Sequence, residues 1–426
     1  MTSIPAPQSL PGPEDISRSA FPNGIVVLAR SNFNSPSVYI NGSILAGSLF
    51  DSDEKLGLAN FVAPALMRGT ARRSFHEIFE SLESVGATLG FSGGTHTTGF
   101  HGMSLAEDLD MLLNLLGEVL RQPVFPEEHI ERLRAQLLTS LAIRAQDTGD
   151  MASMTFDSIV YEGHPYRRPE DGYPETIQAI TQADLGEFHR RHYGPKGMII
   201  TLVGGMEPAQ MIDAVARVLG DWQNPEQPES PALPPVCALD SVTVRRVNIP
   251  GKAQSDLVLG VAGPERRSPD YLPASLGNNI LGQFGMYGRI GDVVREQEGL
   301  AYYAYSSLGG GIGPGPWDVT AGVAPENVER AIELIRAEIG RLITEPVSEA
   351  ELNDSKANYV GRLPLSLESN AGVAGALLNL ERFDLGLDYY QRYSGLINAV
   401  TRAEILETAR RYLHPDRLGI GVAGPE

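Results

Sequence analysis

Apolar residues recur at helical spacing in two long segments of the chain. In the segment 107–120 they occupy positions 109, 112, 113, 116 and 120, and in the segment 326–342 they occupy positions 328, 332, 335, 339 and 342. Spacings of three and four residues place these side chains on one helix face, so both segments are predicted to be amphipathic helices. Each helix runs into a Pro-Val dipeptide and then into another acidic helix start.

Shorter apolar segments predict strands. Residues 24–30 and 37–46 lie after a Pro-Asn-Gly turn, and residues 198–203 and 418–422 are closed by Gly204 and, one residue further on, by Gly424. The Gly- and Thr-rich segment 87–103 is typical of a hairpin. Because strands and helices are mixed without regular β-α-β alternation, we predict an α+β protein whose sheets are mainly antiparallel and packed with helices.

The chain contains an internal repeat with a spacing of 220 residues. The segment 179–185, Ala-Ile-Thr-Gln-Ala-Asp-Leu, returns as Ala-Val-Thr-Arg-Ala-Glu-Ile at 399–405. In both copies a threonine, Thr181 or Thr401, precedes an acidic residue by three positions, which is the capping-box pattern of a helix start. Together with the two similar helices above, this match indicates a tandem duplication.

A proline-rich stretch marks the boundary between the two copies. Five prolines fall within the eleven residues 225–235, among Gln, Glu and Ser, and such a composition is typical of an extended, semi-rigid linker. We therefore predict an N-terminal domain at residues 1–223, a linker at residues 224–241 and a homologous C-terminal domain at residues 242–426. Each domain is long enough to bury a core of its own.

Charge and composition exclude several classes of partner. The net charge of −19 disfavours nucleic acid and anionic membrane surfaces. No apolar segment is long enough to span a bilayer, and residues 1–21 lack the basic and apolar regions of a signal peptide. The single cysteine, Cys237, excludes an internal disulfide. We therefore expect a cytoplasmic protein with no membrane partner.

The most informative stretch for function is residues 60–64, Asn-Phe-Val-Ala-Pro, between Gly-Leu-Ala and Arg-Gly-Thr flanks. With these flanks it resembles the pitrilysin-like (insulinase and processing-peptidase) zinc metallopeptidases, inverzincins with an H-x-x-E-H helix. In that family the five positions read His-x-x-Glu-His. The degenerate zinc-motif positions here are Asn60, Ala63 and Pro64. Ala and Pro offer zinc no side-chain ligand, and a lone Asn amide is a poor one.

The resemblance covers roughly residues 15–424 and implies two related α+β domains that form a half-shell. It also implies a distal Glu as third zinc ligand on the next long helix, but the segment 137–142 has no carboxylate and the first one after it is Asp147. We therefore predict that this chain holds no metal or other cofactor and has no catalytic residues of its own. Zinc is expected in a partner subunit.

Other histidines are weak replacements for the missing ligands. His189 and His192 share one face of a predicted helix, but neighbouring arginines favour a polar surface position over a metal site. His96 and His101 lie five residues apart in the predicted hairpin, on opposite faces of a regular strand, and no carboxylate partner accompanies them.

A second constellation is retained in the C-terminal half. The segment 295–302, Arg-Glu-Gln-Glu-Gly-Leu-Ala-Tyr, resembles the family's characteristic C-terminal motif, whose Arg and Tyr hold the substrate backbone near the zinc. The resemblance therefore implies that Arg295 and Tyr302 bind substrate. A guanidinium suits a peptide carbonyl or carboxylate, and a phenol can donate to a scissile carbonyl. The structural alternative pairs Arg295 with Glu296 or Glu298 and packs Tyr302 in a core.

The glycine-rich segment 309–315 lacks the Lys-Ser or Lys-Thr ending of a phosphate-binding loop. A wide turn between two strands is the favoured interpretation, and the sequence leaves open whether this segment has a further role.

We predict a non-catalytic subunit of a heteromeric zinc peptidase. In this hypothesis the chain supplies the Arg/Tyr pair in trans to a homologous H-x-x-E-H subunit and closes a peptide-degrading chamber. The alternative is a purely structural or peptide-binding scaffold with no role in proteolysis. An independent hydrolase is disfavoured, because the chain has no Gly-x-Ser-x-Gly element and no reactive-looking cysteine. The peptide substrate, and whether a homodimer forms in isolation, stay open.

Overall fold

The computed structural model describes residues 10–283 and 288–425. Residues 1–9, which belong to the predicted N-terminal domain and to the stretch examined for a signal peptide, therefore lie outside the described part. The chain forms two compact units, each assembled from three stretches. Unit 1 comprises the chain up to residue 135, residues 170–231 and residues 361–395. Unit 2 comprises residues 136–169, residues 232–360 and the chain from residue 396.

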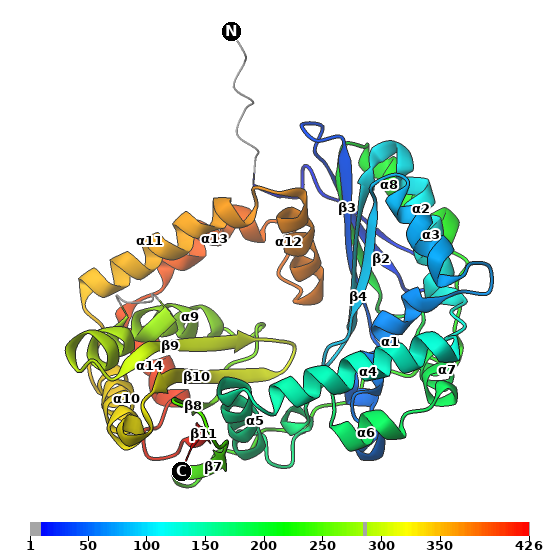
Figure 1. The fold of residues 1–426 in the computed structure, drawn as a ribbon. Coiled ribbons are helices and arrows are strands. Elements are labelled where there is room, and N and C mark those ends of the chain that lie inside the picture. Colours follow the sequence, from blue (N-terminus) through cyan, green and yellow to red (C-terminus); the bar gives the residue numbers. More distant parts are fainter. Residues whose placement is uncertain (1–9, 284–287, 426) are drawn as a thin grey trace. The chain divides into compact units, whose positions relative to one another are not determined.

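Unit 1 is built on a six-stranded sheet in the order β1-β2-β6-β3-β5-β4, of which Figure 1 labels β2, β3 and β4. Among the described strands of this sheet, only β2 and β6 run parallel, and the other neighbours are antiparallel. The strands are β1 (Ser17–Ala20), β2 (Val26–Ser31), β3 (Ser37–Ile44), β4 (Thr88–Ser92), β5 (Thr98–Leu105) and β6 (Ile199–Gly204).

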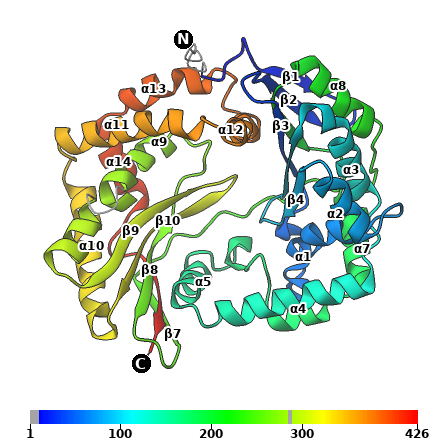
Figure 2. The ribbon, with the colours of Figure 1, turned by 45° about the horizontal axis from the view of Figure 1, so that its top comes forward.

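Helices cover both faces of this sheet. Helix α12 (Asn370–Arg382) packs on β6 and β3 from one side, and α3 (Leu109–Arg121) and α8 (Pro208–Leu219) lie on the other (Figure 2). Helix α3 confirms the amphipathic helix predicted near 107–120, and its predicted apolar positions are all buried. The other helices of unit 1 are α1 (Leu58–Ala65), α2 (Phe75–Glu83), α6 (Pro174–Ala179) and α7 (Gln182–His192).

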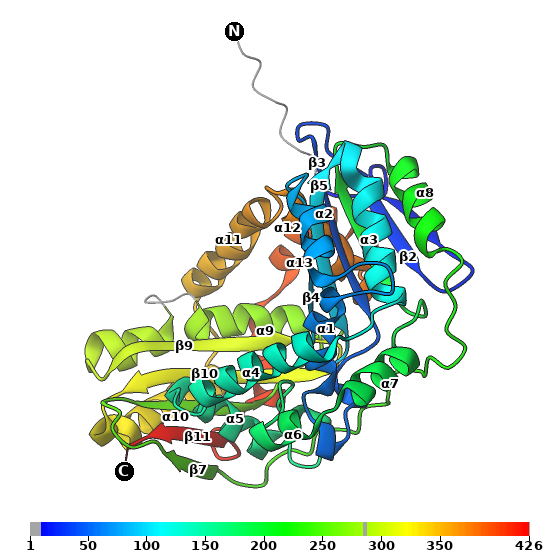
Figure 3. The ribbon, with the colours of Figure 1, turned by 45° about the vertical axis from the view of Figure 1, so that its right-hand side comes forward.

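Unit 2 repeats the same topology. Its five strands follow the order β7-β11-β8-β10-β9, with β7 and β9 at opposite edges (Figure 3). The order matches β2-β6-β3-β5-β4 strand for strand, including the parallel pair β7–β11. This agreement confirms the predicted α+β fold with two related, mainly antiparallel domains. The strands are β7 (Thr243–Asn248), β8 (Ser255–Ala262), β9 (Ala301–Gly310), β10 (Pro314–Val323) and β11 (Gly419–Gly424).

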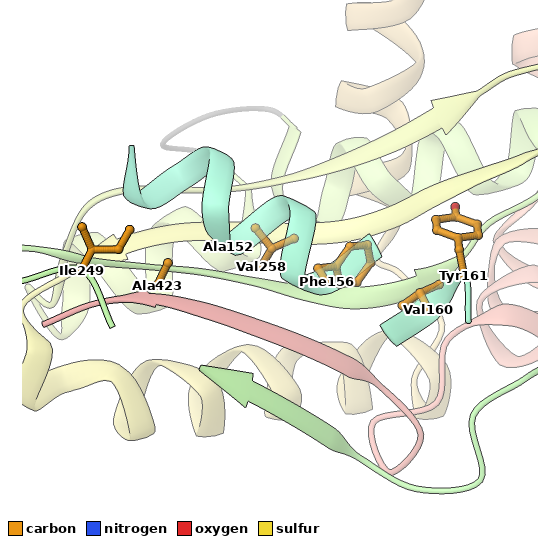
Figure 4. Packing of buried hydrophobic residues seen from close by; sticks show 7 residues of the cluster. All are labelled: Ala152, Phe156, Val160, Tyr161, Ile249, Val258 and Ala423. Atoms are coloured by element: carbon orange, nitrogen blue, oxygen red, sulfur yellow. The ribbon is translucent and has the colours of Figure 1, made fainter. Parts of the chain in front are cut away.

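The helices of unit 2 also lie on both faces of its sheet. Helix α5 (Thr148–Val160) packs against β11, β8 and β7, and its apolar residues form a core cluster with strand residues such as Val258 and Ala423 (Figure 4). Helix α10 (Val328–Thr344) confirms the second predicted amphipathic helix and contacts β10 and β8. The unit further contains α9 (Tyr271–Asn278), α14 (Arg402–Tyr412) and the π-helices η6 (Asn279–Gln283) and η8 (Gly291–Gln297).

The two units exchange equivalent helices. Helix α5 follows the strands of the first repeat but packs in unit 2, and its counterpart α12 follows those of the second repeat but packs in unit 1. The chain crosses between units within α4 (Glu127–Arg144), α11 (Glu349–Ser366) and α13 (Tyr389–Ala399). The compact units therefore do not coincide with the contiguous stretches 1–223 and 242–426, which describe the repeat. Residues 224–241 form no helix or strand.

None of the helices in the described part of the chain combines the length and the apolar composition needed to cross a bilayer.

Both predicted capping boxes are present. Thr181 accepts a hydrogen bond from the Asp184 N–H at 3.2 Å, and Thr401 accepts one from the Glu404 N–H, also at 3.2 Å. In each box the carboxylate of the acidic residue accepts from the threonine N–H in return. Each box thus satisfies two backbone donors at a helix start, one through each side chain.

Removing either cap should lower stability. We expect Thr181→Ala and Thr401→Ala each to cost about 1 kcal/mol, because the N–H of Asp184 or Glu404 loses the hydroxyl that accepts its hydrogen bond. Urea midpoints of unfolding measure the effect, with Thr181→Ser and Thr401→Ser as controls that keep the hydroxyl. Alanine variants with the midpoint of the serine variants would show that the caps do not contribute.

Candidate functional site

The three degenerate zinc-motif positions lie on α1. The Asp51 carboxylate, which is buried, caps this helix by accepting hydrogen bonds from the N–H groups of Gly57 and Ala59, each at 3.0 Å. Ala63 is completely buried, and Pro64 lies inside the helix. Because proline has no N–H, the carbonyl of Asn60 loses its usual helical partner, and α1 ends one residue later.

The neighbourhood of Asn60 is occupied by protein rather than shaped for an ion. A Cβ atom added to Gly93, in the turn between β4 and β5, would lie 2.6 Å from Asn60 Cα and 2.8 Å from its side-chain oxygen. Within the described residues, no group of three or more His, Cys, Asp or Glu side chains could hold a metal. The side chains at positions 60, 63 and 64 therefore do not fit a catalytic zinc ion.

His192 is a core residue, not a surface residue as predicted, and His189 is half-buried. The His192 ring stacks against Phe50 and Phe188 at centroid distances of 4.4 and 4.5 Å, and only 8% of the residue is exposed. The His189 Nε2 lies 2.9 Å from the Leu120 carbonyl. Burial, aided for His192 by the nearby Arg191, lowers the pKa of both rings, that of His192 to about 4. Burial thus favours the neutral form of both imidazoles.

Arg295 and Tyr302 lie on consecutive elements of unit 2 that pack together. Arg295 is part of the π-helix η8, which contacts β9, and Tyr302 is the second residue of β9. Gly299 joins the two elements with φ near +63°, a left-handed conformation that glycine adopts without strain, and its N–H donates to the Arg295 carbonyl at 3.1 Å. The turn at Gly299 therefore determines how the Arg295 and Tyr302 side chains are placed relative to each other.

Both side chains are accessible. Tyr302 is 83% exposed, which excludes the structural alternative of a core tyrosine. The Arg295 side chain is 40% exposed, and its Nε lies 3.6 Å from a Glu296 carboxylate oxygen, a contact longer than a hydrogen bond. The predicted pairing with Glu296 is therefore present only as a loose, solvent-exposed ion pair, which holds Arg295 weakly.

The backbone is irregular at both positions. In the pairing of β9 with β10, Tyr303 faces Gly322 and Ala301 faces Val323, so Tyr302 is an extra residue without a partner, as in a β-bulge. Bulges redirect a side chain at a sheet edge and are frequent beside functional sites. Single π-helical turns are likewise enriched at functional sites. The two predicted substrate-binding residues thus coincide with the two local departures from regular structure in this segment.

The segment is anchored by residues that the sequence motif did not single out. Arg289, two residues before η8, donates to the Glu351 carboxylate at 2.7 and 3.1 Å, and Ser348 N–H donates to it at 2.7 Å. Burial alone would raise the pKa of Glu351, but these hydrogen bonds outweigh it and lower the pKa to about 2. A bidentate Arg–carboxylate pair of this kind fixes the start of η8 on α11.

Two acids of unit 2, the buried Asp318 and the half-buried Asp157, also escaped the sequence prediction. Asp318 accepts from Ser307 at 2.7 Å and Thr320 at 3.3 Å, and burial raises its pKa. Burial and the charge of Asp318 raise the pKa of Asp157 to about 7. The only signal in the sequence is an acid within the apolar strand that becomes β10. Because hydroxyl groups satisfy Asp318, its role is structural.

The glycine-rich segment 309–315 forms the turn between β9 and β10, as predicted. Its glycines permit close packing, since an added Cβ at Gly310 or Gly313 would clash with the rings of Tyr271 or Tyr166.

Comparison with known proteins places the chain in a family. Residues 26–169 match the profile of insulinase (peptidase family M16), and residues 179–359 match that of the peptidase M16 inactive domain. The chain belongs to the M16, or pitrilysin-like, peptidase family.

Relatives of the M16 chain cover nearly its whole length. An uncharacterized zinc protease of Mycobacterium leprae is 25% identical over 96% of this chain and 92% of its own. One of Streptomyces coelicolor is 24% identical over 85% and 79%. Among solved structures, the peptidase M16 inactive domain from Pseudomonas fluorescens is 26% identical, with a TM-score of 0.86 and coverage of 97% and 98%. A Helicobacter pylori protease shares the fold, with 19% identity, a TM-score of 0.88 and coverage of 98% and 100%.

Within the M16 family this chain is a member whose zinc motif is degenerate. Its α1 is capped by the buried Asp51 carboxylate and is largely buried, but Ala63 and Pro64 on it have no donor atoms for a metal. The region of Arg295 and Tyr302 lies inside the segment that matches the inactive-domain profile.

We expect the purified M16 chain to contain no stoichiometric zinc and to cleave no peptide alone, because Ala63 and Pro64 have no ligand atoms. Restoring the motif as Asn60→His, Ala63→Glu and Pro64→His should not create a peptidase, because the distal Glu is also absent. Metal analysis by mass spectrometry measures the zinc content, and a quenched-fluorescence peptide assay measures the cleavage. One zinc ion per wild-type chain, with chelator-sensitive cleavage, would contradict the prediction.

The depressed pKa of His192 should make stability depend on pH. Between about pH 6.5 and 4 the unfolded chain binds this proton and the folded chain does not, so stability falls as the pH falls through that window. His192→Phe keeps the aromatic contacts but cannot be protonated. The wild type should therefore lose urea stability relative to this variant from pH 7 to pH 4.5, with His76→Gln, at an exposed histidine, as the control. If the difference in urea stability between the wild type and His192→Phe stayed constant from pH 7 to pH 4.5, the assignment of a depressed pKa to His192 would be refuted.

Proposed function

We propose that this chain is the non-catalytic subunit of a two-chain zinc peptidase. In the proposed complex, a homologous subunit with an intact H-x-x-E-H helix supplies zinc and the general base, and this chain supplies Arg295 and Tyr302 in trans. The two chains together enclose a chamber for peptides, and we expect them to act in the cytoplasm.

The proposal rests on two features together: the side chains at positions 60, 63 and 64 do not suit zinc, and Arg295 and Tyr302 are present and accessible. Positions 63 and 64 have no ligand atoms, so this chain needs another source of metal chemistry if it takes part in proteolysis. A tyrosine that is 83% exposed at a bulge contributes little to the core, and a weakly paired arginine beside it is free to bind a ligand. Because exposure of Arg295 and Tyr302 adds little to the stability of the fold, it favours a binding role for both side chains.

The chemistry of the pair suits a peptide backbone. The Arg295 guanidinium presents donors in a planar fork that can bind a peptide carbonyl or a carboxylate. The Tyr302 hydroxyl can donate to a scissile carbonyl, and that hydrogen bond strengthens as negative charge develops on the oxygen. Because η8 is fixed by Arg289 and Glu351, the two donors are held on a common rigid segment before substrate arrives.

The location on an edge strand also supports peptide binding. Strand β9 is the last strand of its sheet, so one row of its backbone donors and acceptors has no strand partner among the described residues. An extended peptide can add to such an edge through main-chain hydrogen bonds. The acidic surface of the chain, with a net charge of −19, favours peptides that carry positive charge.

Substitution of the pair should abolish most of the activity of the complex. With the H-x-x-E-H homologue from the same genome present, we expect Arg295→Ala and Tyr302→Phe each to lower kcat/KM about a hundredfold, because each removes a preorganised donor. Association of the subunits, measured by analytical ultracentrifugation, should not change. Arg410→Ala and Tyr305→Phe are matched controls that alter an exposed Arg and an exposed Tyr of the same unit.

The scaffold alternative makes the opposite prediction. If both variants support full peptidase activity while the complex still assembles, the pair is structural and the chain is a scaffold. If no zinc-bearing homologue associates with the chain, a peptide-binding role without proteolysis replaces the proposed function.

A further inference from the structure

Unit 2 contains a cavity on a different part of its surface from Arg295 and Tyr302. Its volume is about 270 Å³. Its apolar walls come from four parts of unit 2, namely the end of α5, the proline-rich linker, the end of β8 and the start of β10. The apolar residues that line it are Val160, Val236, Leu239, Val261, Ala262 and Pro314.

The apolar wall is continuous with the core of unit 2. Val160 belongs to the buried cluster formed by α5, β8 and β11, as Figure 4 shows. Val236 and Leu239 pack against the same cluster from the linker. The wall is therefore supported by packed side chains, a property of preformed ligand sites.

The polar part of the lining is exclusively basic or uncharged. Arg411, His414 and Arg417, from the end of α14 and the turn after it, line the cavity together with Tyr412 and Cys237. No Asp or Glu is among its lining residues in the described part of the chain, although the protein has 53 acidic and 34 basic residues. Such a lining in an acidic protein creates a local preference for anions.

The arginines differ in how far they are neutralised. Arg411 donates to Asp270 at 2.6 Å, and Tyr412 donates to the same carboxylate at 3.1 Å. Arg417 forms no ion pair with any described residue, and its side chain is exposed at the cavity. One uncompensated guanidinium next to an apolar wall matches a ligand with a single negative charge and a hydrocarbon part.

We propose that this cavity binds a small apolar carboxylate, with the aliphatic part against Val160, Leu239 and Val261 and the carboxylate on Arg417. Its volume of about 270 Å³ lies near the lower end of the range for small-molecule sites, which suits a medium-chain fatty acid or a leucine-like residue with a free C-terminal carboxylate. This site is independent of the proposed peptidase function.

The single cysteine of the chain provides a direct probe. Cys237 is exposed and lines the cavity, so a bound ligand should shield its thiol. If the occupied form does not react, octanoate at ten times its Kd should slow alkylation of Cys237 by a fluorescent maleimide about tenfold, in a saturable way. Isothermal titration calorimetry measures the same Kd without depending on shielding.

Matched ligands and variants separate the two parts of the proposed recognition. Octanol lacks the charge and acetate lacks the chain, so both should bind at least about tenfold more weakly than octanoate. Arg417→Gln should weaken octanoate binding by a similar factor, and Arg330→Gln, which removes the same charge from a remote helix, should not. Ala262→Met should fill the cavity and weaken binding, with the urea midpoint confirming that each variant is folded.

N-acetyl-leucine distinguishes the two sources of such a carboxylate. Stronger binding of octanoate indicates a fatty acid, and stronger binding of N-acetyl-leucine, but not of its amide, indicates a peptide C-terminus; either result supports the proposal. Equal binding of octanol and octanoate, unchanged affinity in Arg417→Gln, or no calorimetric binding of either acid to the wild type overturns it.

Discussion

The close approach of α5 to β11 is the contact on which the organisation of unit 2 depends. A Cβ atom on Gly421 would lie 2.3 Å from the Ala152 carbonyl oxygen and 2.6 Å from the Phe156 nitrogen, so only glycine allows the helix backbone this near. Gly419 permits the same approach at Val160, where an added Cβ would lie 2.7 Å from Cγ2. Because interiors tolerate neither overlap nor voids, a larger residue in β11 would lift the helix off its sheet.

Several functional features follow from that placement. The hydroxyl of Thr148, at the start of α5, donates to Asp256, which also accepts from Tyr303 beside Tyr302. At the other end, the Tyr161 hydroxyl donates to the Pro314 carbonyl at 2.9 Å, and Val160 contributes to the apolar wall of the cavity. One helix therefore supports both the edge strand that carries the proposed substrate-binding tyrosine and the proposed carboxylate site.

The degenerate motif helix shows that stability and metal binding rest on different atoms. Helix α1 keeps a buried carboxylate cap and an apolar face, and these contacts hold it in place. Zinc would depend only on side-chain donors at three positions, which can be lost without disturbing the core. In this chain Ala63, at the position of the motif Glu, is fully buried, and Pro64, at the position of the last motif His, lies inside the helix, so both side chains contribute to packing.

The sequence alone determined the features that depend on local pattern. Periodic apolar residues defined α3 and α10, Thr181 and Thr401 defined two helix starts, and the absent donors at positions 63 and 64 excluded a zinc motif. Each follows from residues close together in the chain, where spacing translates directly into geometry. Arg295 and Tyr302 were predicted differently, from the resemblance of an eight-residue segment to a family motif.

Tertiary structure alone decided the long-range features. An amphipathic helix such as α5 is compatible with either sheet, and the glycines of β11, more than 250 residues away, select its partner. His189 and His192 are flanked by arginines in sequence, yet His192 packs against Phe50 in the core, and His189 is half-buried with its ring nitrogen near the Leu120 carbonyl. The bulge at Tyr302 and the cation-lined cavity likewise arise from strand register and from segments that meet only after folding. Pattern sets which face of an element is apolar, and packing sets what that face contacts.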